Sequence, residues 1–199
     1  MKRSFSTKEI VIIAIFTALT TILSQIAIPF PSSPAPISFG VVAVYITGIL
    51  LKPKHAVFAQ VCYLLIGAIG LPIFGNFRGG VGALFGVTGG YLMVYPIMSC
   101  IISFALNSRY SRAHRQEKND IWIFIKAGIS IFAANILCYL CGTLWMCITS
   151  GITFESAIMI AVYPFIPFDI AKIIFCIAVA VPLRLRMLKM DMLLIDDVT

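Results

Sequence analysis

Long apolar segments, separated by short polar or glycine- and proline-rich stretches, dominate this sequence. Hydrophobic residues make up 60% of the 199 residues and charged residues only 12%, about half the charged fraction of a typical soluble domain. A membrane-spanning helix needs about 20 mostly apolar residues, so this length allows about six spans and no separate soluble domain. The sequence therefore predicts a single all-α, multi-pass membrane domain over residues 1–199.

Six transmembrane helices are expected from the apolar segments. Ser6 or Thr7 is placed to cap the first helix, and the four prolines of PFPSSPAP at 29–36 end it. The fourth helix is expected to bend or break near VTGG at 87–90, where two glycines adjoin. The predicted spans are about Lys8 to Pro29, Phe39 to Leu51, Ala56 to Phe74, Gly80 to Leu106, Ile121 to Thr149, and a last span that begins near Phe154 or after Pro167 and ends near Pro182.

Basic residues predict the orientation, because Lys and Arg concentrate on the cytoplasmic side of membrane proteins. With both termini placed in the cytoplasm, 13 of the 15 basic residues fall inside, all except Arg78 and Lys172. The net charge of +7 therefore reports topology, and we expect no nucleic-acid binding. His55 and His114 fall in inner loops, where a solvated surface role is expected. The inner basic residues are Lys2, Arg3, Lys8, Lys52, Lys54, Arg109, Arg112, Arg115, Lys118, Lys126, Arg184, Arg186 and Lys189.

The two exceptions mark the expected ligand site. Arg78 lies at the outer end of the third span, and Lys172 lies within the sixth, three residues after Asp169. Charged groups inside membrane segments are costly and usually face a bundle interior or a wet cavity, and a spacing of three puts Asp169 and Lys172 on one helix face. Two cations and one acceptor suit a small ligand that carries a carboxylate and N–H donors. The alternative is that Asp169 and Lys172 neutralise each other as a structural pair.

Half of the 14 glycines lie in GNFRGGVGALFGVTGGY at 75–91. Glycine allows positive φ and close approach to a ligand, which predicts irregular backbone around a cavity. The spacing of Gly82, Gly86 and Gly90 equally fits close helix packing. Other polar candidates for the site, each also able to serve a local hydrogen bond, are Gln60, Asn76, Tyr91, Asn135 and Tyr139. Apolar walls are expected from Phe74, Phe77, Phe165 and Phe168.

Catalysis finds no support in the sequence. It has no GxxxxGK[ST] phosphate loop and no HExxH, and no histidine lies within an expected span. Cys138 and Cys141 form a CxxC, but no second CxxC or nearby histidine completes a zinc set, so all six cysteines are expected to be reduced and structural. We expect no metal, no cofactor and no enzymatic activity, only binding and movement within membrane lipid.

Small residues also mark one face of the first span. Ala14 and Ala18, in AIFTA, have the small-xxx-small spacing that lets another helix approach closely. From the spacing alone, that helix is either a neighbour within this chain or part of a partner.

AIGLPIF at 68–74, TGGYL at 88–92 and PFIPFDIAK at 164–172, in this order and spacing, resemble the BioY family, the biotin-binding S components of energy-coupling factor (ECF) transporters. The resemblance extends from AIFTALT in the first span to Lys172. Two positions depart from the family pattern: Val87 stands where proline is usual before TGG, and Phe168 stands where glycine commonly precedes the aspartate. Phe168 is therefore expected to narrow or reshape the pocket.

This resemblance implies a six-helix S component in a bacterial cytoplasmic membrane, with both termini inside and a biotin pocket near the outer face. It implies biotin-binding roles for Asp169 and Lys172 and, by the glycine-loop match, for Asn76, Arg78 and Tyr91. Ala14 and Ala18 match the alanine motif that docks on the transmembrane coupling subunit, with two separate ATPase subunits supplying energy. An autonomous or proton-coupled carrier using Asp169, or a membrane enzyme acting on a small acid, is the alternative.

Overall fold

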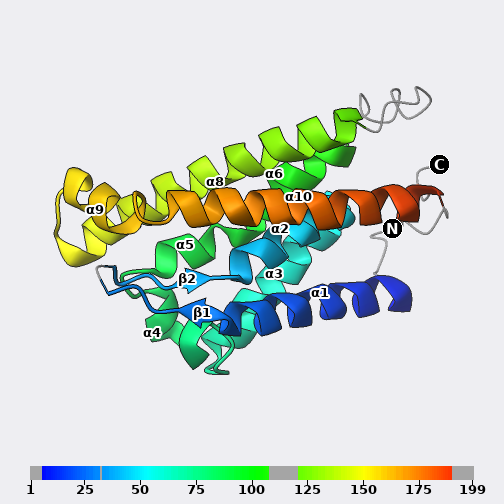
Figure 1. Cartoon of the computed structure of the whole chain (residues 1–199). Helices are drawn as coiled ribbons and strands as arrows, with labels where there is room; N and C mark the ends of the chain where they lie inside the picture. The colour runs from blue at the N-terminus through cyan, green and yellow to red at the C-terminus, as the bar shows by residue number, and fades with distance from the viewer. Residues whose placement is uncertain (1–5, 32, 108–120, 190–199) are drawn as a thin grey trace.

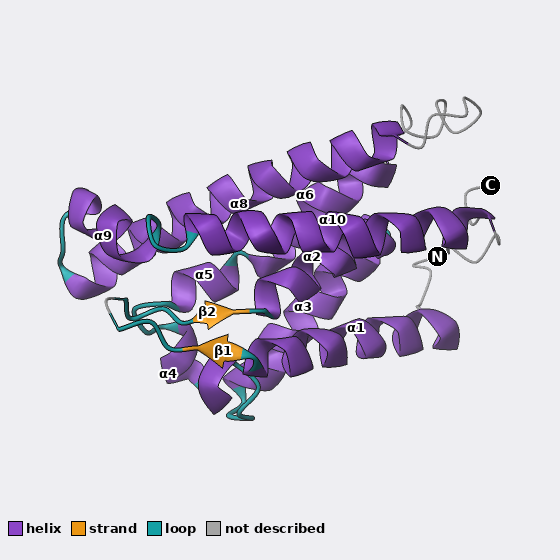
Figure 2. Ribbon diagram, in the orientation of Figure 1, coloured by secondary structure: helices purple, strands orange, loops and turns teal. Residues whose placement is uncertain are grey.

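The computed structural model describes residues 6–31, 33–107 and 121–189, and it is a bundle of helices (Figure 1; Figure 2). A short antiparallel pair of strands and a 3-10 turn, η1, lie near one end of the bundle. The elements are α1 (Thr7–Gln25), β1 (Ala27–Ile28), β2 (Ile37–Ser38), α2 (Gly40–Leu50), α3 (Pro53–Ala68), η1 (Gly75–Phe77), α4 (Val81–Leu84), α5 (Gly89–Met93), α6 (Tyr95–Asn107), α8 (Ile121–Ser150), α9 (Phe154–Ala161) and α10 (Ile166–Lys189).

Helix α1 begins where the sequence predicts. The Ser6 hydroxyl accepts a hydrogen bond from the Glu9 backbone N–H at 3.3 Å, and the Glu9 carboxylate accepts one from the Ser6 N–H at 2.8 Å, which is a capping box. After α1 the proline-rich loop closes back on itself, because Ala27 pairs with Ser38 and Ile28 with Ile37. The sequence did not predict these two strands.

Four helical stretches of the described chain are long and apolar enough to cross a membrane: Thr7–Gln25, Gly89–Asn107, Ile121–Ser150 and Ile166–Leu188. The chain is thus a multi-pass membrane protein. Helices α2, with 11 residues, and α3, with 16 residues, are shorter than a full span.

The predicted limits of several spans differ from those in the structure, and the first helix, for example, ends at Gln25, not Pro29. The third helix ends at Ala68, not Phe74, because glycine and proline follow it at Gly70 and Pro72. The fourth is broken, as expected, between Leu84 and Gly89. The sixth divides into α9 and α10, and α10 continues through Pro182 to Lys189, so the predicted end near Pro182 is wrong.

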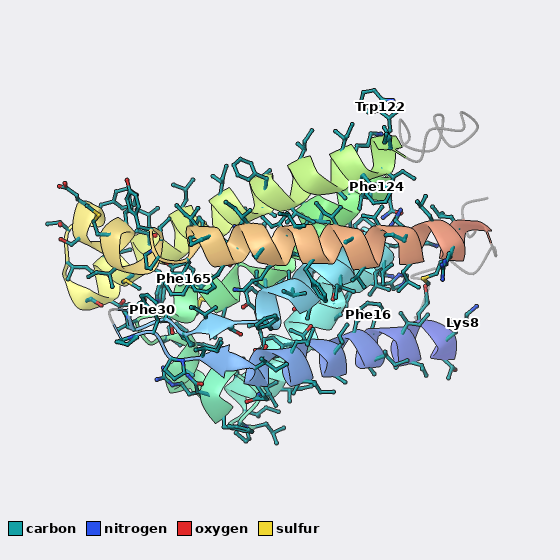
Figure 3. The ribbon with its side chains drawn as sticks, viewed as in Figure 1. Lys8, Phe16, Phe30, Trp122, Phe124 and Phe165 are labelled. Atoms are coloured by element: carbon teal, nitrogen blue, oxygen red, sulfur yellow. The ribbon has the colours of Figure 1, made fainter. Side chains whose placement is uncertain are left out.

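One end of the bundle, which we call the basic end, joins helix termini through polar contacts. His55 Nε2, at the start of α3, lies 2.9 Å from Glu9 Oε1, at the start of α1. Arg184 of α10 donates hydrogen bonds to the carbonyls of Ile49 in α2 and Leu106 in α6. Figure 3 shows Lys8 and Trp122 at this end, and Figure 1 shows that α1 begins and α10 ends there.

One inner-loop prediction needs correction at the basic end. His55 was expected at a solvated surface but is 3% exposed, and Arg184, which was predicted only to lie on the inner side, is also 3% exposed. The helix termini they contact converge there and exclude water. His114, Lys2, Arg3 and the basic residues Arg109, Arg112, Arg115 and Lys118 lie outside the described residues.

Hydroxyl and amide groups join α1, α2 and α3 in the bundle interior. The Thr17 hydroxyl donates to the Ala59 carbonyl at 3.0 Å. The Gln60 side chain donates to the Thr20 hydroxyl at 3.1 Å and to the Thr47 hydroxyl at 3.2 Å. Gln60, which we had expected near a ligand, therefore lies in a helix–helix contact and is fully buried.

Candidate functional site

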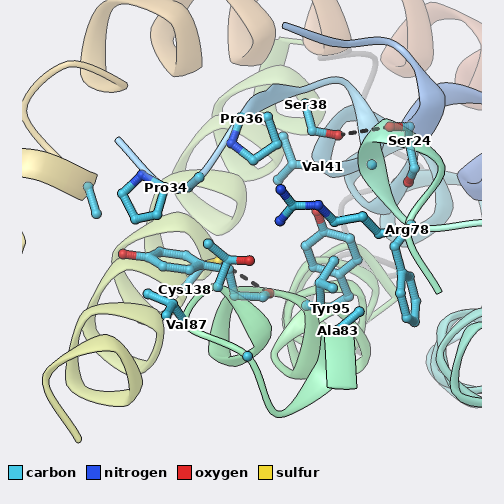
Figure 4. Close-up of a pocket in the computed structure, with 18 of the residues that line it drawn as sticks. Ser24, Pro34, Pro36, Ser38, Val41, Arg78, Ala83, Val87, Tyr95 and Cys138 are labelled. Carbon is cyan, nitrogen blue, oxygen red and sulfur yellow. Dashed lines mark hydrogen bonds between the residues drawn. The ribbon is translucent and has the colours of Figure 1, made fainter. Parts of the chain in front are cut away.

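A cavity of about 630 Å³ (Figure 4) lies toward the end of the bundle opposite the basic end, where Figure 3 shows the lining residue Phe165. Its volume is in the range of small-molecule sites, roughly 300–1,000 Å³. Segments distant in sequence converge on it: the end of α1, the loop before β2, the glycine-rich stretch, α8 and the start of α10. The polar side chains that line it are Ser24, Ser38, Tyr63, Arg78, Thr88, Tyr91, Tyr95, Asn135, Tyr139, Asp169 and Lys172.

A charged pair forms one wall of the cavity. The Lys172 ammonium donates to Asp169 Oδ1 at 3.0 Å, and the Tyr139 hydroxyl, from α8, donates to Asp169 Oδ2. Asp169 and Lys172 are each 7% exposed. Lys172 Nζ also lies 6.0 Å from the centre of the Phe39 ring. Both charges are thus paired and largely withdrawn from solvent while they still face the cavity.

Arg78 reaches the cavity from a tight loop. The backbone of Phe74 exchanges two hydrogen bonds with that of Arg78, at 2.9 and 3.2 Å, and the intervening Asn76 and Phe77 adopt positive φ of 59° and 54°. This turn aims the Arg78 guanidinium into the cavity, as Figure 4 shows. Among the residues that the structure describes, Arg78 has no acidic partner. Its charge is available to an anion.

The loop is fixed in position by its own packing. The Phe74 ring is 2% exposed and meets the Tyr63 ring edge-on, with centroids 5.4 Å apart. Gly67 makes room for it, since a Cβ at Gly67 would lie 2.1 Å from the Phe74 ring. Phe74 therefore anchors the turn that carries Arg78.

Glycines of the 75–91 stretch serve both of the roles that the sequence left open. Gly75, Gly79, Gly82 and Gly86 line the cavity. Gly90 instead allows close helix contact, because a Cβ there would lie 2.3 Å from Trp145 of α8. In return, Gly142 of α8 faces the ring of Tyr91, where a Cβ would also lie at 2.3 Å.

Six of the eight predicted polar candidates line the cavity, and two do not. Gln60 is bound between α1 and α2, and Asn76 is exposed in the turn that presents Arg78. Of the predicted aromatic walls, Phe74 and Phe165 line the cavity, whereas Phe77 is 71% exposed. Phe168 is 44% exposed and is not among the residues that line the cavity, so the expectation that it narrows the cavity is wrong.

The sequence reasoning missed five hydroxyl groups that line the cavity, those of Ser24, Ser38, Tyr63, Thr88 and Tyr95. Tyr63 donates to Ser24 at 2.9 Å, and both side chains line the cavity. A signal for Ser24 exists, since Thr17, Thr20 and Ser24 recur every three or four residues and form the buried face of α1. Ala14 and Ala18 lie on another face of α1, which is exposed.

The model of the BioY family matches residues 1–189. The chain belongs to the BioY family. Its relatives include the probable biotin transporter BioY of Pyrococcus horikoshii, 30% identical over 83% of this chain and 89% of the relative. They also include the biotin transporter BioY of Thermotoga maritima, 28% identical over 92% of this chain and 99% of the relative.

A solved structure, the S-component for biotin from an ECF-type ABC transporter, has the same fold as this BioY chain. The two superpose with a TM-score of 0.77 and 24% sequence identity, covering 91% of this chain and 95% of the other. BioY proteins are transport proteins, so this chain is not an enzyme.

Proposed function

We propose that this chain binds biotin in the cavity and takes it up across the membrane as the substrate-specific S component of an ATP-driven ECF transporter. The observation that carries the proposal is the cavity itself, which combines a buried acceptor, Asp169, with a cation, Arg78, that has no acidic partner in the described part of the chain. The identity of the ligand is inferred from membership of the BioY family, whose relatives are biotin transporters.

The charges of the cavity match the two ends of biotin. Asp169 accepts hydrogen bonds from the ureido N–H groups, while the Lys172 ammonium donates to Asp169 Oδ1 at 3.0 Å. Arg78 receives the valerate carboxylate, because a guanidinium offers a fork of donors that fits a carboxylate. Tyr91 and Asn135 complete the polar lining, while Phe74 and Phe165 contact the apolar parts of the ligand.

The proposed topology has six passages through a bacterial cytoplasmic membrane, with both termini inside. Two observations support it: α1 begins and α10 ends at one end of the bundle (Figure 1), and the described cations Lys8, Lys52 and Lys54 belong to the basic end. In this orientation the whole chain forms one membrane domain, and the cavity opens toward the outside.

Energy for uptake comes from partner proteins in this proposal. The exposed face of α1 that carries Ala14 and Ala18 docks on the transmembrane coupling subunit, since small residues let a partner helix approach closely. Two ATPase subunits bind the coupling subunit and drive the cycle.

Equilibrium binding of biotin to the purified protein in detergent tests the ligand assignment. We expect Asp169→Asn and Lys172→Met each to weaken binding at least about tenfold, because each removes a charged hydrogen bond from a largely dry wall. Arg186→Met is the matched control, since Arg186 is exposed on the same helix at the basic end. It should bind biotin as the wild type does.

The outcomes separate the hypotheses. A wild-type protein that does not bind biotin would end the biotin assignment. Asp169 and Lys172 variants that bind biotin as tightly as Arg186→Met would make the pair structural and place the ligand contacts elsewhere. Strong uptake by cells that lack every coupling subunit would instead favour an autonomous carrier.

A further inference from the structure

Tyr139 joins two helices at the cavity wall. It lies on α8, and its hydroxyl donates to Asp169 Oδ2 on α10, 30 residues away in sequence. Tyr139, Asp169 and Lys172 all line the cavity. The contact is therefore not a remote brace between helices but part of the surface that a ligand meets.

The Asp169 carboxylate has donors on both of its oxygens. Lys172, one turn along the same helix, binds Oδ1 at 3.0 Å, and Tyr139, from the other helix, binds Oδ2. A carboxylate has about four lone-pair sites, so the two protein donors leave about two. Because Asp169 is 7% exposed and lines the cavity, those two sites are available to a ligand there.

The two donors constrain the orientation of the Asp169 carboxylate to different degrees. An ammonium on a flexible stem acts as a point charge and follows the carboxylate as it turns, whereas the χ2 torsion of aspartate is broad and roughly two-fold. A hydroxyl held on a separate helix defines the plane of the carboxylate. Without it, Lys172 alone would leave the plane free to turn.

We propose that Tyr139 is a positioning residue that orients the Asp169 carboxylate to accept two neighbouring N–H donors from the ligand. This inference rests on the proposed function, in which the ureido group of biotin supplies those donors. Tyr139 acts through Asp169, and its hydroxyl oxygen need not touch the ligand.

A double-mutant cycle with biotin binding as its readout tests this role. Tyr139→Phe removes only the hydroxyl, and it should weaken biotin binding about ten- to a hundredfold, the range for a hydrogen bond to a charged group. In an Asp169→Asn background the same change should cost less than about threefold, because the carboxylate that Tyr139 orients is then gone.

Tyr163→Phe is the matched control, since Tyr163 is 60% exposed and does not line the cavity; it should change binding less than about twofold. Thermal unfolding of each ligand-free variant in detergent shows whether the fold survives. Equal losses for Tyr139→Phe in both backgrounds would mean that Tyr139 only supports the helix pair, and would overturn the proposal. Unchanged binding by Tyr139→Phe would overturn it too, while tight binding by the wild type would leave the biotin assignment intact.

Discussion

Replacing Gly142 with alanine tests how the wall of the cavity is held. A Cβ at Gly142 would lie 2.3 Å from two carbons of the Tyr91 ring, whereas ordinary van der Waals contacts begin near 3.4 Å. The ring must therefore move by about 1.1 Å, the difference between these distances. Because Tyr91 lines the cavity, the movement changes the ligand site as well as the packing of α5 on α8.

The size of the effect follows from three contributions. Overpacking of a close contact costs about 1–3 kcal/mol. Loss of the hydrogen bond between the Tyr91 and Thr143 hydroxyls, at 3.2 Å, adds about 0.5–1.5 kcal/mol. Alanine gains about 0.8–1 kcal/mol over glycine in a helix. We expect Gly142→Ala to be less stable by about 0.5–3.7 kcal/mol.

Gly128→Ala is the control for this prediction, because Gly128 lies on the same helix and a Cβ there would meet only Ile177, at 3.6 Å. It should be as stable as the wild type or more stable by up to about 1 kcal/mol. Thermal unfolding in detergent should show a midpoint lower by roughly 1–15 °C for Gly142→Ala. Its biotin binding should be weaker by at least about tenfold. If the two alanine variants unfold and bind alike, Tyr91 is not held against α8 in this way.

Two further predictions concern the basic end and α1. Arg184→Met should lower the free energy of unfolding by roughly 2–4 kcal/mol, because the carbonyls of Ile49 and Leu106 lose a charged donor inside the bundle. Arg186 is exposed two residues later, and Arg186→Met should change that free energy by less than about 0.5 kcal/mol. Equal melting temperatures for the two variants would refute a role for Arg184 in joining the helices. The double variant Ala14→Leu, Ala18→Leu should bind biotin within about twofold of the wild type. It should no longer co-purify with a coupling subunit, because the larger side chains hold a partner helix away. Unchanged co-purification would place the docking surface elsewhere on the chain.

The sequence predicts much of the cavity wall, because the residues that form it are energetically costly to place in a membrane segment and are therefore conspicuous. A charge within a membrane segment is expensive, so Asp169, Lys172 and Arg78 stand out against an apolar background, and all three line the cavity. Neutral polar residues carry no such mark. The sequence does not distinguish Gln60 from Asn135 as a ligand contact. In the structure, Gln60 of α3 binds side chains of α1 and α2, whereas Asn135 lines the cavity.

Helix limits were predictable where local chemistry sets them and not where tertiary contacts do. The cap at Ser6 and the break before Gly89 follow from side-chain oxygens and from glycine, and both occur. The strand pair at Ala27 and Ser38 forms only because the loop between them folds back. The continuation of α10 through Pro182 likewise has no local signal, since proline in a helix interior normally predicts an end.

The two buried cations of α10 show why the same rule finds one site and hides another. Lys172 violates the expected placement of basic residues, and its partner Asp169 lies three residues away, so both position and sequence point to it. Arg184 lies where a basic residue is expected, and its acceptors include two backbone carbonyls and the Asn107 side chain. Every residue has a carbonyl, so such acceptors leave no pattern in a sequence. Sequence reasoning therefore detects a buried charge that lies where basic residues are not expected, and it overlooks one that binds helix ends where a basic residue is expected.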